Sequence, residues 1–373
     1  MGKDLKGKEL GVGISQQSDG LYVARCTDIN GRRRAKRFHK LQECRSWLAA
    51  ENQNKAEKKA TNDMIVDEWF TCWIKIKEQT TRVSTYESYR HRYQVDIYPV
   101  IGKMLLTEVK PIHCQKVFTN MAQIGRSNGT MELTRVVLYG LLSSAAENDL
   151  IDKNPCLWSI KSNIGKPKAE RTALTKTEQE KFVKLIQGCL YENQFRLILQ
   201  TGLRIGEVAG LQWNDIDFNK KTLAVNRTAY LSSIYREWMV GLPKSSSGKR
   251  LVPLTDEAVR ILKKQKHEDK TLKVIQKDFC NYVFLSTEGG PIPDSKYCYF
   301  LRRLCRENGL RSVTPHVLRH TFATRCIEAG MKPKTLQKIL GHANIGITMN
   351  VYVHISEEEK MDEINKISYA LNF

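Results

Sequence analysis

The chain has 373 residues, enough for two or three domains, and its 60 Lys and Arg against 40 Asp and Glu give a formal net charge of +20. This excess favours nucleic acid over a membrane surface as a partner, although a basic solvated surface would give the same count. There is no apolar run of the ~18–20 residues that a membrane span needs, no apolar signal core at the N-terminus and no C-x-x-C pair among the ten cysteines. We therefore expect a soluble, cytoplasmic protein with reduced cysteines and no bound metal.

The first 60 residues are expected to form a small sheet followed by a helix. Asp19-Gly20 and Asn30-Gly31 are hairpin dipeptides, because these residue types adopt positive φ at low cost, and L-Y-V-A-R-C-T between them is strand-like. A helix follows from about residue 41 to residue 59. The strand after the second turn carries a basic run that either reaches DNA phosphates or protects a solvated edge strand: Arg32, Arg33, Arg34, Lys36 and Arg37.

Residues 61–160 have a helical pattern. Ile65, Trp69, Trp73 and Ile76 recur at helical spacing, which indicates a buried stripe. The later segment Y-E-S-Y-R-H-R-Y mixes tyrosine with basic residues and is either an amphipathic surface helix or a helix that contacts DNA phosphates, through Arg90 and Arg92. Residues 161–173 are rich in Lys, Gly and Pro and are expected to be a linker between domains.

Residues 174–373 combine helices with a small antiparallel sheet. The segments 222–230, 236–240 and 250–254 are strand-like, and S-S-S-G before the last of them is expected to be a turn. Helices are predicted from Thr255, from about Asp294 and from Pro315 onward. The expected fold is therefore multidomain: a small β-sheet with a helix, an all-α domain, and a mainly helical α+β domain with a small antiparallel sheet.

Two arginines in this last region are candidates for binding a phosphodiester. A guanidinium never deprotonates and its planar fork matches two phosphate oxygens. Arg204 lies between buried-looking segments, with Glu207 three residues later to orient it, although a structural ion pair would look the same. His316 and Arg319 are also three residues apart, at the start of a helix that Pro315 opens.

Three further residues could complete such a site. His342 follows Gly341, a plausible helix C-cap, so that a turn would aim its side chain. Tyr352 could be a nucleophile or could simply pack its ring against the protein. Lys244 precedes the S-S-S-G turn and could belong to the site or be solvated at a hairpin tip. The neighbouring Arg250 is expected to contact phosphate or solvent. No H-E-x-x-H motif accompanies the histidines, which argues against a metal site.

Taken together, these residues resemble a known family. The order and spacing of T-G-L-R-I-G-E, P-K-S-S-S-G-K-R, H-V-L-R-H, L-G-H and T-M-N-V-Y-V-H resemble the tyrosine recombinases of the lambda-integrase type. The resemblance implies that Tyr352 attacks DNA to form a 3′-phosphotyrosyl link, that Arg204 and Arg319 clamp the phosphate, and that Lys244 protonates the leaving 5′ oxygen. His316 would assist proton transfer and His342 would support the transition state, without ATP, metal or another cofactor.

The same resemblance implies an organisation and a set of partners. Residues 1–60 would bind arm-type DNA sites, residues 61–160 the core site, and residues 174–373 would be catalytic, ending in a helical tail that packs in its own subunit or on a neighbour. The expected protein is an integrase of a conjugative transposon or temperate phage, associated with the bacterial nucleoid. It would act as a homotetramer on double-stranded DNA, with an excisionase and a host DNA-bending protein. A type IB-like topoisomerase and a non-catalytic DNA-binding regulator are the alternatives.

Overall fold

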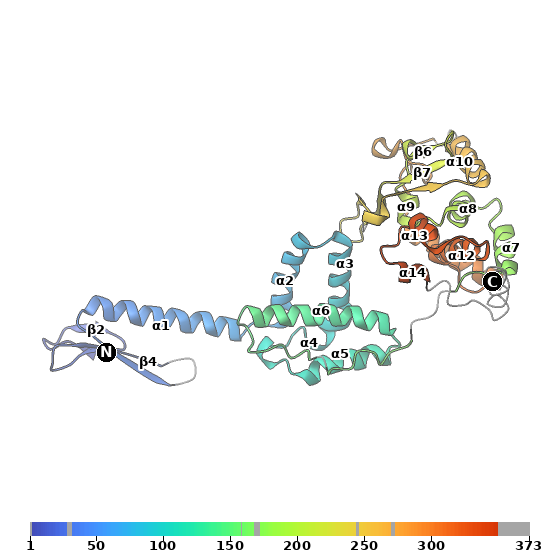
Figure 1. Cartoon of the computed structure of the whole chain (residues 1–373). Helices are drawn as coiled ribbons and strands as arrows, with labels where there is room; N and C mark the ends of the chain where they lie inside the picture. Colours follow the sequence, from blue (N-terminus) through green and yellow to red (C-terminus); the bar gives the residue numbers. More distant parts are fainter. Residues whose placement is uncertain are drawn as a thin grey trace, which may run out of the picture. The chain divides into compact units, whose positions relative to one another are not determined.

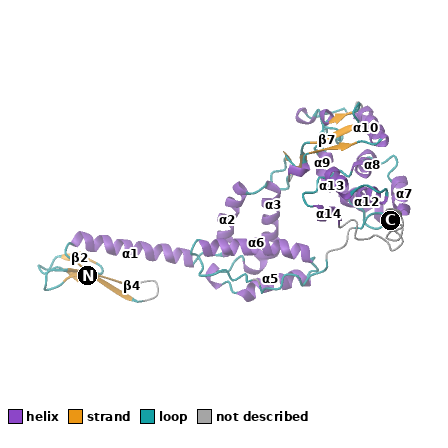
Figure 2. Ribbon diagram, viewed as in Figure 1, coloured by secondary structure: helices purple, strands orange, loops and turns teal. Residues whose placement is uncertain are grey.

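The computed structural model describes residues 2–27, 32–157, 159–167, 172–243, 246–269 and 273–349. The chain divides into two compact units, Met1–Lys168 and Ala169–Phe373 (Figure 1). Helices dominate, and the strands are confined to small sheets (Figure 2). Lys244, Tyr352 and the helix predicted near the C-terminus lie outside the described residues.

The first unit begins with the predicted sheet and helix. Strands β1 (Gly2–Lys3) and β2 (Glu9–Gly11) pair with each other, and β3 (Ile14–Gln16), β4 (Tyr22–Thr27) and β5 (Arg33–Phe38) form an antiparallel sheet in that order. The Asp19-Gly20 dipeptide lies in the β3–β4 connection, with Gly20 at φ +83° as predicted. Helix α1 (Leu41–Asn62) follows, and its Cys44 and Trp47 pack with Ala24 of the sheet.

The rest of the first unit is helical, as predicted. It contains α2 (Val66–Thr80), α3 (Val83–Arg92), a π-helical turn (Tyr93–Ile97), α4 (Tyr98–Ile101), a 3₁₀ turn (Leu106–Glu108), α5 (Pro111–Gln123) and α6 (Asn128–Glu147). Trp69 and Trp73 are buried, and the Trp69 indole donates to the Leu141 carbonyl at 3.1 Å. The predicted stripe stops there, because Ile76 is 54% exposed.

Much of the segment that we expected to be a linker belongs to the first unit. Arg135 of α6 donates to the Ile160 carbonyl at 2.7 Å, and Gln115 of α5 exchanges two hydrogen bonds with the backbone of Lys161. The Asn128 side chain accepts a hydrogen bond from the Gly165 amide. Side chains of α5 and α6, of which Arg135 is buried, therefore hold the backbone at Ile160, Lys161 and Gly165, and local composition contains no sign of such partners.

The second unit is built on helices α7 (Lys176–Leu185), α8 (Glu192–Thr201), α9 (Ile205–Ala209), α10 (Asp256–Asp269), α11 (Asp294–Glu307), α12 (Pro315–Glu328), α13 (Pro333–Leu340) and α14 (Ile345–Met349). Its core includes Phe195 of α8, Leu262 of α10, Tyr297 of α11 and Leu318 of α12. Short 3₁₀ turns occur at Trp213–Asp215, Ser246–Gly248 and Lys277–Phe279. This mainly helical unit with small sheets agrees with the predicted fold class.

The strands of the second unit differ from the prediction in their pairing. Strands β10 (Arg250–Pro253), β7 (Thr222–Val225) and β6 (Ile216–Asp217) form one sheet, while β8 (Thr228–Leu231) pairs with β9 (Trp238–Gly241). The single strand expected over 222–230 is interrupted because Asn226 and Arg227 turn their side chains to Asp215. Strands β9 and β10, which come before and after Lys244 in the sequence, therefore belong to two separate sheets and do not pair with each other. Among the described helices, none combines the length and apolarity of a bilayer-spanning segment.

Candidate active site

Arg204 lies at a sharp turn between two helices. Helix α8 ends at Gly202, which has φ +66°, and a Cβ there would lie 2.5 Å from Phe322 and 2.7 Å from Leu340. Arg204 then caps α9: its amide donates to Oε2 of Glu207 at 2.9 Å and its Nη1 donates to Oε1 at 2.8 Å. The expected contact with Glu207 is therefore present. The Arg204 side chain keeps 41% of its surface exposed, whereas that of Glu207 is buried.

Arg319 approaches the same place from α12. Pro315 opens this helix, as the sequence indicated, and the Thr314 side chain caps it by accepting a hydrogen bond from the Val317 amide. The buried guanidinium donates to the Gly202 carbonyl at 2.6 Å and to the Leu340 carbonyl at 2.7 Å. Burial and the charges of Arg204 and Arg250 lower the pKa of Arg319 to about 9, so the group is still a cation at neutral pH.

His342 completes the cluster from the end of α13. Gly341 is the predicted C-cap, with φ +65°, and it turns the chain so that Nε2 of His342 lies 3.0 Å from Nη2 of Arg319. Because a guanidinium only donates, Nε2 must accept, and Nδ1 then carries the proton and donates to Oγ1 of Thr348 at 2.9 Å. Burial and the neighbouring arginines lower the pKa of His342 to about 4, so the ring is neutral at pH 7.

His316 is exposed on the first turn of α12. Its charge is among those that lower the pKa of His342, so the two imidazoles are electrostatic neighbours. The described part of the predicted site therefore brings Arg204, Glu207, Arg319 and His342 into direct contact, with His316 nearby.

The comparisons with known proteins agree with this geometry. Residues 172–359 match the phage integrase family, and residues 66–122 match the phage integrase N-terminal SAM-like domain. The chain belongs to the phage integrase family. It is a tyrosine recombinase that acts in site-specific DNA recombination, as the motifs predicted. The topoisomerase and regulator alternatives are not favoured.

Relatives of this recombinase match it along most of its length. The transposase from transposon Tn916 of Enterococcus faecalis and that from Tn1545 of Streptococcus pneumoniae are each 26% identical, over 98% of this chain and 96% of theirs. The solved Tn1549 transposon integrase, in complex with a circular intermediate DNA, is 26% identical with a TM-score of 0.68, over 82% of this chain and 99% of that one.

For Arg250, which also belongs to this cluster, the prediction of a contact with phosphate or solvent was wrong. Instead of facing solvent or phosphate, its side chain is 5% exposed and donates to both carboxylate oxygens of Glu207, each at 2.9 Å. Although burial opposes ionisation, these bonds and the charge of Arg204 hold the pKa of Glu207 below its ordinary value. The strand period offered a signal: Arg250 is two residues from Val252, which is buried, so both side chains point inward.

The predicted DNA-contacting residues fall into two groups. Residues 32–37 of the basic run are exposed, and so is Arg90. Arg92, in contrast, is buried, and its guanidinium donates to Asp96 at 2.7 Å; Thr134 also donates to that carboxylate. The expectation that Arg92 contacts DNA conflicts with this burial. Its charge neutralises an internal carboxylate that the sequence pattern did not reveal.

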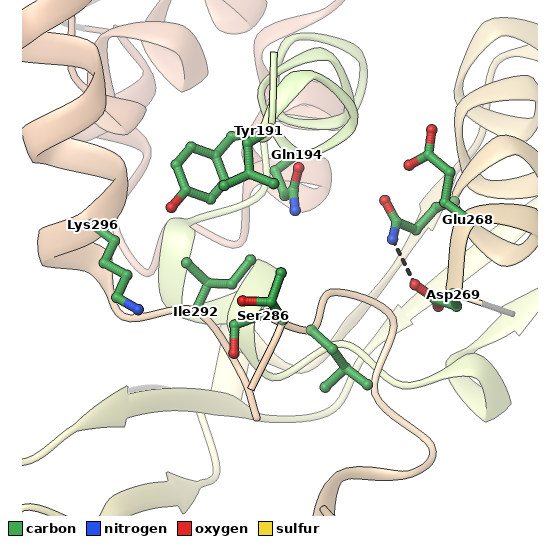
Figure 3. A pocket seen from close by; sticks show the side chains of 11 residues that line it. Tyr191, Gln194, Glu268, Asp269, Ser286, Ile292 and Lys296 are labelled. Carbon is green, nitrogen blue, oxygen red and sulfur yellow. Dashed lines mark hydrogen bonds between the residues drawn. The ribbon is translucent and has the colours of Figure 1, made fainter. Parts of the chain in front are cut away.

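Two of the hollows among the described residues of the second unit bear on the site. One, of about 220 Å³, is lined by Tyr191 and Gln194 of α8, Asp269 of α10 and Lys296 of α11 (Figure 3), and none of its lining residues belongs to the arginine cluster. The other, of about 470 Å³, adjoins His342 and includes Lys249, Lys334 and Lys338, so its wall is basic. Within the described ranges, no three His, Cys, Asp or Glu side chains are grouped to hold a metal ion.

Proposed function

We propose that this recombinase integrates and excises a mobile DNA element of the conjugative-transposon kind. The observation that carries the proposal is the meeting of Arg204, Arg319 and His342, from three separate segments, at the C-terminal turn of α13. Relatives that span nearly the whole chain are transposases of Tn916 and Tn1545, which favours a transposon over a phage.

In the proposed reaction, the Tyr352 oxygen attacks the scissile phosphorus and forms a 3′-phosphotyrosyl bond while the bond to the 5′ oxygen breaks. Lys244 gives a proton to that leaving oxygen, and His316 takes the proton of the phenol. Arg204 and Arg319 stabilise the charge on the non-bridging oxygens. The 5′ hydroxyl of a partner strand then reverses the step, so the phosphotyrosine conserves the bond energy and no ATP is consumed.

The first unit supplies the proposed DNA-binding surfaces. Ala24 of β4 packs on α1, and its cross-strand partner in β5 is Lys36, so Lys36 lies on the α1 side of the sheet. Arg34, two residues earlier, lies on the same side, 3.7 Å from Glu51 of α1. Arg33 and Arg37 alternate to the opposite face. We therefore assign arm-site phosphate contacts to Arg33 and Arg37, with Arg32 preceding the strand, and core-site contacts to Arg90 of α3.

The remaining partners follow from the proposed reaction. Exchange between two duplexes requires four cleavages, which fits a homotetramer on DNA, and a choice between integration and excision fits an excisionase and a host DNA-bending protein. Such an enzyme would work in the bacterial cytoplasm, at the nucleoid. The domain roles proposed are arm binding for residues 1–60, core binding for 61–160 and catalysis for 174–373.

The test uses the whole chain with duplexes tiled across both ends of the DNA element that encodes it. We expect one duplex to give a covalent adduct on a denaturing gel, and expect Tyr352→Phe to bind that duplex equally well without forming the adduct. An adduct retained by Tyr352→Phe would remove this residue from the reaction. Relaxation of supercoiled DNA without any exchange between two marked duplexes would support a topoisomerase instead.

A further inference from the structure

Three successive carbonyls at the end of α13 each accept a hydrogen bond from a different arginine. Ile339 accepts from Nε of Arg250 at 2.5 Å, Leu340 from Nη2 of Arg319 at 2.7 Å, and Gly341 from Nη2 of Arg204 at 3.3 Å. The last carbonyls of a helix have no partner within the helix and carry its negative dipole end. The end of α13 therefore holds three cations together in one place.

Glu207 joins the same three arginines from the other side. Its Oε1 accepts from Arg204 and Arg250, its Oε2 accepts from the Arg204 amide and Arg250, and Nη1 of Arg319 lies 4.0 Å from Oε2. The Glu207 carboxylate and the end of α13 thus bind the same three guanidinium groups. Removing one of these arginines would therefore change the contacts that hold the other two in place.

The three arginines differ in what they can offer to DNA. The Arg204 side chain is 41% exposed, whereas those of Arg319 and Arg250 are 4% and 5% exposed, so Arg250 differs from Arg319 in its committed N–H groups and not in its burial. Arg250 donates through Nε to Ile339, through Nη1 to both Glu207 and the Gly248 carbonyl, and through Nη2 to Glu207. Since a guanidinium has five N–H groups, at least four are committed within the protein.

Arg250 also fits closely against the turn that aims His342. A Cβ added to Gly341 would lie 2.7 Å from the Ser247 carbonyl and 3.0 Å from Cδ and Nη1 of Arg250. Glycine at this position is thus required both by φ +65° and by the nearness of Arg250. The strand that carries Arg250 is in this way fastened to the end of α13.

We propose that Arg250 is a positioning residue of the recombinase: through Glu207 and the Ile339 carbonyl it fixes Arg204, Arg319 and the His342 turn before DNA arrives, and it does not itself contact the scissile phosphate. This inference rests on the proposed roles of Arg204 and Arg319 as the phosphate clamp. A misplacement of reacting groups by about 1 Å can lower a rate about 100-fold, so a residue outside the contact surface can still control cleavage.

The test compares Arg250→Lys and Arg250→Met with wild type in single-turnover cleavage of the duplex that forms the adduct. Arg260→Met is the matched control, because Arg260 is 74% exposed on α10 and pairs with Glu257 on the same helix. We expect both Arg250 variants to cleave about 100-fold more slowly than wild type at saturating DNA, with a smaller loss of rate for Arg250→Lys than for Arg250→Met. Their affinity for DNA should stay within about threefold of that of wild type and of the control. Melting temperatures are measured for all variants, and Arg250→Lys, which keeps a cation facing Glu207, serves if Arg250→Met does not fold.

The pH profile separates positioning from a general loss of structure. Glu207 is faced by Arg204 before α9, Arg250 of β10 and Arg319 of α12, with His342 bonded to Arg319. Without Arg250 the carboxylate protonates more easily, so the acid limb of the cleavage profile should move to higher pH, whereas simple destabilisation would lower the rate equally at each pH.

Normal cleavage by Arg250→Met would overturn the proposal, and so would a large loss of affinity together with a fall of about 0.9 in the salt slope, which marks a lost phosphate contact. Normal cleavage by Arg204→Lys and Arg319→Lys would instead show that the clamp assignment itself is wrong.

Discussion

Replacing Arg204 with lysine tests the phosphate clamp most directly. Lysine keeps the positive charge next to Glu207 but cannot present two parallel donors. One Arg204 nitrogen bonds to Glu207 at 2.8 Å and the other to the Gly341 carbonyl at 3.3 Å, a longer bond that a phosphate oxygen can replace. The lysine ammonium carries its three N–H groups on one nitrogen, so it cannot place donors at both positions as the guanidinium does, and the variant lacks one correctly placed donor in the transition state.

The loss of one preorganised donor to a developing oxyanion costs about 10²–10³ in rate, or about 2.7–4 kcal/mol. We therefore expect single-turnover cleavage by Arg204→Lys to fall by at least about 100-fold, with DNA affinity little changed. Arg196→Lys on α8 is the matched control, since Arg196 likewise pairs with a glutamate, Glu192, at 2.7 Å on its own helix. If the cleavage rate falls by less than about tenfold, or falls equally in the control, the bidentate role of Arg204 is refuted.

Further predictions concern cofactors, domains, Arg92 and pH. Cleavage and rejoining should proceed in EDTA without ATP, and a strict requirement for Mg²⁺ in the cleavage step would indicate another chemistry. A chain starting at Thr61 should still cut core sites but lose footprints at distant arm sites, and Arg33→Ala with Arg37→Ala should reproduce that loss while Arg34→Ala should not. Arg92→Met should destabilise the first unit by about 3 kcal/mol in urea unfolding, because it removes the guanidinium bonded to the buried Asp96 and leaves it with Thr134 and the more distant Arg126, at 3.7 Å, and it should leave the salt slope of DNA binding unchanged. Because burial lowers the pKa of His342 to about 4, the unfolded chain binds its proton first as pH falls below about 6.5, so wild type should lose thermal stability between pH 6.5 and 4 more steeply than His342→Gln.

The sequence could predict the parts of the site that depend on local spacing. Arg204 with Glu207, Arg319 after Pro315 and His342 after Gly341 are all set by a few neighbouring residues, through helix caps and i, i+3 geometry. The same local signals located most helices and the first sheet. These contacts needed no knowledge of distant partners.

What the sequence could not predict depends on partners far along the chain. Arg92 and Arg250 carry the same charge as surface arginines, and only the fold shows that Asp96 and Glu207 are buried beside them. The linker prediction did not include the contacts of Lys161 and Gly165 for the same reason, since Gln115, Asn128 and Arg135 lie on other helices. A polar or charged segment of sequence is therefore a reliable sign of solvent exposure only where the fold supplies no buried hydrogen-bonding or charged partner for it.

The two hydrogen bonds of His342 respond differently to a proton. The bond from Nδ1 to Thr348 survives in both charge states of the ring, whereas the bond that Nε2 accepts from Arg319 exists only while the ring is neutral. Thr348 is fully buried in α14, four residues before Tyr352 in the sequence. Proton uptake would therefore release the imidazole from Arg319 and give the site one more donor and one more positive charge, while the ring stays bonded to α14, which precedes the proposed nucleophile Tyr352 in the sequence. One ring nitrogen of His342 thus keeps its hydrogen bond in both charge states, while the other nitrogen changes from acceptor to donor.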